Sequence, residues 1–125
     1  MYIYNLSTFH INTDFYLRER MRKTIIVDPM KNLTETYFDV VQEAHHEFGE
    51  NVFVLIQIGS FFEVYGKSHE KFSRLEGSKI EEYAKICGIS IAEKSGISVK
   101  HTWTNVDGKT ETLKCKLMMC GYRDY

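Results

Sequence analysis

The sequence predicts an α/β (α+β) fold, in which one mixed β-sheet carries helices packed mainly on one face. Three observations lead to this prediction. Residues 34–48 and 78–87 repeat apolar side chains at helical spacing. Residues 52–58 form a continuous apolar run, and Asp107-Gly108 separates two further strand-like segments. The expected order of elements is α-β-β-α-β-β-β.

The two helices are predicted from their apolar stripes. The stripe of 34–48 consists of Tyr37, Val40, Val41, Ala44 and Phe48, and Gly49 follows as a natural end of the helix. The stripe of 78–87 consists of Ile80, Tyr83, Ala84 and Cys87. Ser78 and Glu81 have the spacing of a capping box, which predicts that this helix begins at Ser78.

The strands are predicted from runs of apolar residues and from the turns between them. The run "VFVLIQI" at 52–58 is typical of a strand covered on both faces. A bend at Gly59-Ser60 leads to a second, antiparallel strand over 61–65. A short strand is expected at 89–92. The last two strands, 96–104 and 110–120, flank the turn "NVDG".

Composition and length indicate one domain. The chain has 125 residues, of which 43% are hydrophobic and 26% charged, an ordinary globular balance. Residues 1–30 carry no clear pattern and are interpreted as an N-terminal extension, followed by a domain over 31–125. No apolar run approaches the roughly 20 residues that cross a bilayer, and the start lacks a secretion signal. We therefore expect an intracellular protein with no membrane partner.

The cysteines favour neither a disulfide framework nor a metal site. There are three, Cys87, Cys115 and Cys120, an odd number without a secretory signal. The Cys115-x4-Cys120 spacing is wrong for zinc, and a second ligand pair is lacking, so no metal is expected. An enzyme using Cys120 or His101 is disfavoured because neither has a supporting motif.

The segment "GSFFEVY" at 59–65 raises a question of side-chain direction. Because side chains alternate along a strand, Phe61, Glu63 and Tyr65 share one face, and Phe62 lies on the other. An unpaired carboxylate is costly to bury, so the Glu63 face is predicted to be exposed or part of a site. Phe61 would then be an exposed aromatic residue. The alternative is that Phe61 folds over the sheet edge and Glu63 pairs with Lys67.

The stretch "VFVLIQIGSFFEVYG" closely resembles the N-terminal mismatch-recognition domain (domain I) of the MutS family of DNA mismatch repair proteins. That family has an apolar strand followed by Gly-x-Phe-Tyr/Phe-Glu-x-Phe/Tyr. The resemblance covers 34–125, with "YAKICGISIA" as its next match and "LMMCGYRDY" as a loose one. The segment "GSFFEVYG" is similar to the sequences of the branch of the family found in large DNA viruses and some organelles.

The resemblance implies a DNA-binding role with no catalysis in this chain. The partner would be double-stranded DNA that contains a mismatch. Phe61 would enter the minor groove at a mispaired base and Glu63 would hydrogen-bond that base, with Gly59 forming the bend and Tyr65 packing beside the ring. Phosphate contacts are expected from the basic residues Lys94, Lys100, Lys109, Lys114, Lys116 and Arg123.

The resemblance also defines what lies outside this chain. A complete family member is a dimeric, DNA-dependent ATPase, but no G-x-x-x-x-G-K-S/T phosphate loop occurs here. ATP and Mg²⁺ are therefore expected only in a missing C-terminal part, and this chain is interpreted as a C-terminally truncated domain without a cofactor of its own.

Two hypotheses follow from the motif. An ionised carboxylate only accepts hydrogen bonds, so we hypothesise that Glu63 binds protonated when its base partner is an acceptor. In that case Glu63→Gln keeps mismatch binding. The alternative function is a MutS-type domain that acts as a branched-DNA or protein interaction module without wedge activity.

Overall fold

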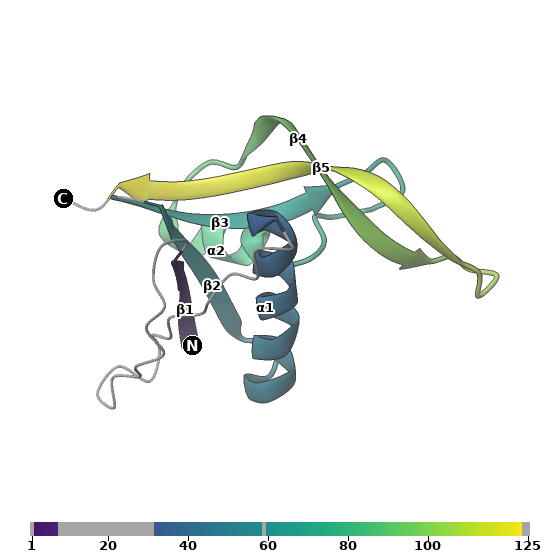
Figure 1. Ribbon diagram of the computed structural model, residues 1–125, viewed down its shortest axis with the longest axis horizontal. Coiled ribbons are helices and arrows are strands. Elements are labelled where there is room, and N and C mark those ends of the chain that lie inside the picture. Colours follow the sequence, from purple (N-terminus) through teal and green to yellow (C-terminus); the bar gives the residue numbers. More distant parts are fainter. Residues whose placement is uncertain (1, 8–31, 59, 124–125) are drawn as a thin grey trace.

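The computed structural model describes residues 2–7, 32–58 and 60–123 (Figure 1). Within these ranges the predicted α+β class is confirmed. The elements in chain order are β1 (Tyr2–Ser7), α1 (Leu33–Phe48), β2 (Val52–Ile58), β3 (Phe61–Ser68), α2 (Ile80–Cys87), β4 (Ala92–Thr104) and β5 (Thr110–Arg123). Neither described helix is long and apolar enough to cross a bilayer.

The strands form one mixed sheet with the order β1-β2-β3-β5-β4. β1 pairs with β2 in parallel, and all other neighbouring pairs are antiparallel. Residues 2–7 thus form an edge strand, although the sequence places them in an N-terminal extension. The short strand expected at 89–92 does not form by itself, since β4 begins at Ala92 and continues through an irregularity between Glu93 and Ser98.

The two helices cover opposite faces of the sheet, so the prediction that they lie mainly on one face is wrong. α1 packs on the face that carries Val54 and Ile56 of β2. α2 packs on the face that carries Phe53 and Leu55 of the same strand. The physical reason is the continuous apolar run of β2, because such a strand exposes hydrophobic surface on both faces until both are covered.

Helix α1 begins at a cap and is tied to two strands through one tyrosine. The Asn32 side chain accepts a hydrogen bond from the backbone N–H of Glu35 at 2.8 Å, which satisfies one free donor of the first turn. The buried hydroxyl of Tyr37 donates to the carbonyl of Val54 at 2.7 Å and accepts from the N–H of Tyr65 at 3.2 Å. One side chain therefore joins α1 to β2 and β3.

Helix α2 begins two residues later than predicted, because the capping box does not form. Its N-cap is Lys79, which makes no side-chain cap bond. The hydroxyl of Ser78 instead donates to the carbonyl of Tyr65, and Glu81 accepts from the backbone N–H of Leu75 at 3.3 Å. Both residues of the predicted box are thus used to hold the loop before α2 against the sheet.

The β4–β5 hairpin is confirmed, with its turn at the predicted Asp107-Gly108. The positive φ of 80° at Gly108 suits this turn, and Asn105 closes it by accepting from the N–H of Asp107 and of Lys109. In β5 the buried residues Leu113, Cys115 and Leu117 alternate with exposed Thr112, Lys114 and Lys116. The hairpin extends well beyond the two helices (Figure 1).

Candidate nucleic-acid interface

Three strand ends meet where the candidate site begins. Phe61 opens β3, and its backbone partners are Ile58 at the end of β2 and Arg123 at the end of β5. Gly59, predicted to form the bend, lies outside the described residues. The meeting point places the first side chain of β3 at one end of the sheet.

Phe61 and Phe62 take the sides that the alternation predicts. The Phe61 side chain is 49% exposed, and the guanidinium of Arg123 lies 5.4 Å from its ring centroid. Phe62 is buried on the α2 face and stacks on the ring of Tyr122, with 5.3 Å between centroids. A large aromatic ring is therefore presented to solvent beside a cation, while its neighbour anchors the strand.

Glu63 is buried, which corrects the first of the two predicted alternatives, that its face is exposed to solvent. Its side chain lies on the α1 face and the residue is only 7% exposed. Lys94 donates to Oε1 at 3.1 Å and to Oε2 at 3.3 Å, and Tyr65 donates to Oε1 at 3.0 Å. An ammonium and a hydroxyl thus replace the lost water, and this pairing is what makes the burial tolerable. The alternative partner, Lys67, makes no bond to Glu63.

Lys94 reaches Glu63 because of the irregular part of β4. The regular register of β4 with β5 is interrupted between Glu93 and Ser98, and Lys94 lies within that interruption. Its Nζ also lies 5.4 Å from the ring centroid of Tyr65. Bulges commonly redirect a side chain in this way. The sequence gives no local signal for this pair, since the two residues are 31 positions apart.

Tyr65 supports Glu63 from within the core and is not a surface contact. It is 1% exposed and packs edge-on against Tyr37. Burial raises the pKa of its phenol above the usual range, and the nearby Glu63 raises it further. The hydroxyl therefore keeps its proton at neutral pH and donates to the carboxylate. The prediction that Tyr65 packs beside the Phe61 ring as part of the binding surface is corrected accordingly.

Gly121 is a further site residue that the sequence analysis did not identify. It lies opposite Glu63 on β5. A Cβ at this position would come 2.4 Å from the carbonyl oxygen of Phe62 and 3.2 Å from Cγ of Glu63. A glycine inside a strand-like run is the signal that could have indicated this close approach.

The predicted phosphate-contacting residues do not form one cluster. Arg123 lies beside Phe61 and Lys94 is paired with Glu63. The others belong to the extended hairpin. Lys109 lies in the turn of the hairpin. Lys114 and Lys116 lie on the exposed side of β5. Lys100 of β4 pairs with Lys114. From Arg123 to Lys116 the strand rises by roughly 23 Å, so these lysines are far from the aromatic ring.

Cys115 and Cys120 do not converge on a common position. Cys115 is buried in the core on the α1 face, and Cys120 in the core on the α2 face. Burial raises the pKa of the Cys120 thiol to about 11. The two thiols are therefore on opposite sides of β5 and protonated at neutral pH. In the described ranges no three side chains of His, Cys, Asp or Glu are grouped as metal ligands.

Comparisons with protein-family models, with curated proteins and with solved structures found no match for this chain.

Proposed function

We propose that the chain is the mismatch-recognition domain of a MutS-like DNA repair protein, which binds DNA and does not catalyse. Phe61 would insert at a mispaired base through the minor groove, with Glu63 close behind on the same strand face. The observation that carries the proposal is the half-exposed ring of Phe61 at the end of the sheet, with Arg123 beside it and a buried acid two residues along.

The energetics of insertion support a preference for mismatches. Wedging a side chain into a base step costs a few kcal/mol of unstacking. Stacking a base on an aromatic ring returns about 1–3 kcal/mol. The two quantities nearly cancel on paired DNA, whereas a mismatch lowers the cost of extruding the base. An exposed aromatic ring can thus discriminate without reading sequence.

The charges around Phe61 fit a negatively charged partner. The guanidinium of Arg123 lies beside the ring, where it would meet a phosphate flanking the inserted side chain. Glu63 brings an acid near the polyanion, but Lys94 neutralises it in the free protein. For Glu63 to reach a base, its bonds to Lys94 and Tyr65 must rearrange, and Lys94 would then be available for a phosphate.

Fluorescence anisotropy tests this proposal. A labelled duplex with one central mismatch is titrated at low salt and compared with the matched duplex of otherwise identical sequence. We expect weak binding, tighter for the mismatch, that falls with added salt because phosphate contacts supply most of the affinity. Equal affinity for both duplexes would contradict the proposal.

One observation favours a second function. Glu63 is almost fully buried and bonded to Lys94 and Tyr65, so its carboxylate is not presented to a ligand in this structure. A domain with this arrangement could bind branched DNA or a protein partner without inserting Phe61 and without reading a mispaired base. Unchanged DNA affinity of Phe61→Ala would favour this function.

A further inference from the structure

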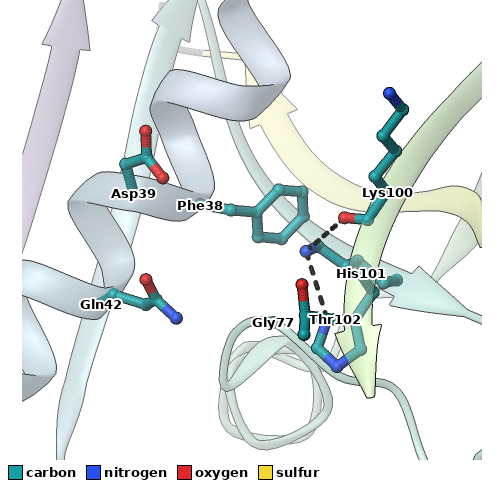
Figure 2. A pocket seen from close by; sticks show the side chains of 8 residues that line it. Phe38, Asp39, Gln42, Gly77, Lys100, His101 and Thr102 are labelled. Carbon is teal, nitrogen blue, oxygen red and sulfur yellow. Dashed lines mark hydrogen bonds between the residues drawn. The ribbon is translucent and has the colours of Figure 1, made fainter. Parts of the chain in front are cut away.

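A polar pocket lies between α1 and β4, apart from the Phe61 end of the sheet (Figure 2). Its volume is about 230 Å³, and it is lined by Phe38, Asp39, Gln42, Lys67, Gly77, Lys100, His101 and Thr102. Pockets that hold drug-sized ligands are usually about 300–1,000 Å³, so this one suits a smaller molecule.

Lys67 places a buried positive charge in this pocket. The residue is 8% exposed, although lysine is rarely buried without a partner of opposite charge. Its ammonium donates to the carbonyl of Lys100 at 2.8 Å and to Nδ1 of His101 at 3.2 Å. In the described part of the chain no carboxylate lies within 4 Å of it. Two neutral acceptors therefore hold a cation whose charge is not neutralised by contact.

The surroundings of Lys67 hold it in place. Its backbone N–H and carbonyl both bond to Glu76, at 2.8 and 3.0 Å. A Cβ at Gly77 would lie 2.8 Å from the Phe38 ring and 3.3 Å from the Lys67 stem, so only glycine allows this packing. The ring of Phe38 lies 4.6 Å from Nζ. The cation is therefore fixed in position before any ligand arrives, which lowers the cost of binding.

One donor of Lys67 is available on the pocket side. An ammonium has three N–H groups, and among the residues that the structure describes the third has no partner other than the Phe38 ring. Since Nδ1 of His101 accepts from Lys67, the neutral ring carries its proton on Nε2, which points away from the Lys67 ammonium. In Figure 2 the amide of Gln42 extends from α1 toward the same space, and Asp39 lies nearly one turn earlier on the helix.

We propose that this pocket binds a small oxyanion, held by the ammonium of Lys67. Asp39 acts on the charge of Lys67 only from beyond ion-pair distance. The anion would add a counter-charge in direct contact, in a place where water is partly excluded and ionic hydrogen bonds are strong. Both a free phosphate or carboxylate and a backbone phosphodiester of DNA offer this chemistry. Asp39 lines the same pocket and opposes a negative ligand, so the anion is expected on the Lys67 side.

Nuclear magnetic resonance titration of the full chain tests the proposal. Inorganic phosphate, acetate and dimethyl phosphate are added separately at constant ionic strength, with sodium chloride as the reference. We expect saturable shifts at the backbone amides of Lys67, His101 and Gln42 for at least one anion. Dimethyl phosphate as the strongest ligand would indicate a nucleic-acid backbone, and inorganic phosphate or acetate a free small anion.

Matched variants decide whether Lys67 is responsible. Lys67→Met should weaken binding at least about tenfold, the usual effect of losing an ionic hydrogen bond, and Lys85→Met at an exposed position of α2 should change nothing. Asp39→Asn should tighten binding, which keeps the test valid if Lys67→Met does not fold. Absence of saturable shifts, or unchanged affinity in Lys67→Met and in Asp39→Asn, would overturn the proposal.

Discussion

The ammonium of Lys94 lies 3.1 Å from the carboxylate of Glu63, two residues along the strand from the exposed ring of Phe61. The ion pair joins the irregular part of β4 to the middle of β3. The pair explains how the carboxylate of Glu63 is tolerated in a nearly buried position. The net charge of the two side chains is zero until a partner competes for one of them.

Replacing Lys94 should destabilise the fold. Lys94→Met leaves Glu63 buried with only the Tyr65 hydroxyl as its donor, and removing one partner of a buried pair typically costs about 3–5 kcal/mol. Because Lys94 is partly exposed, we expect a cost below that range, about 2–3 kcal/mol. Urea unfolding measures the effect. Lys109→Met, in the exposed turn, is the control and should cost less than about 0.5 kcal/mol.

Glu63→Gln should retain mismatch binding. The amide is nearly the same shape, and in the free protein its oxygen can still accept from Lys94 and Tyr65. Once those bonds rearrange, its N–H₂ can donate to an acceptor on the base. We expect affinity within about threefold of the original chain, a difference of under about 1 kcal/mol. Glu63→Ala has neither capacity and serves as the comparison in the same anisotropy assay. Complete loss of binding with glutamine would reject the hypothesis that Glu63 acts in its protonated form.

Gly121→Ala should be more damaging than an ordinary strand substitution. The added methyl would lie 2.4 Å from the Phe62 carbonyl oxygen, a backbone atom that can move only if β3 and β5 separate. We expect a loss of about 1–3 kcal/mol in the free energy of unfolding, the usual cost of overpacking. Thr112→Ala, at an exposed position of the same strand, is the control. Equal stability of the two variants would show that the sheet relaxes freely at Gly121.

His101 should titrate below an unstructured histidine. Burial lowers its pKa from 6.5, and the charge of Lys67 lowers it further. The folded state therefore binds the proton less readily than the unfolded chain, and stability falls as the pH drops through 6.5 toward the lower folded pKa. Above the unfolded pKa this effect is absent. The ring proton shifts measure the midpoint, and His101→Phe should reduce the loss of stability on acidification. A midpoint at or above 6.5 would contradict the described surroundings of Lys67.

Local patterns were sufficient to predict several features. The stripe from Tyr37 to Phe48 predicts α1 because helical periodicity needs no knowledge of the partner surface. The alternation in "FFEVY" predicts that Phe61 faces solvent and Phe62 the core, as found. The Asp-Gly turn likewise sets the β4–β5 hairpin.

The features that were missed depend on contacts between distant segments. The pairing of β1 with β2 is not visible in residues 2–7 alone. The burial of Glu63 is not predicted, because its partner, Lys94, comes from an irregular strand that no local pattern indicates. The burial of Lys67 is similar, since its acceptors lie on β4, 33 and 34 positions away.

The central claim is that the ring of Phe61 discriminates mismatched from matched DNA, and Phe61→Ala tests it most directly. The affinity ratio for mismatched over matched duplex is measured at low salt for the original chain, Phe61→Ala and Tyr122→Ala. Tyr122 is the matched control because its ring is 46% exposed on the neighbouring strand but lies on the opposite face. We expect Phe61→Ala to lower the ratio to about one, because it removes about 1–3 kcal/mol of base stacking. Tyr122→Ala should leave the ratio unchanged. A ratio that survives in Phe61→Ala would contradict the claim.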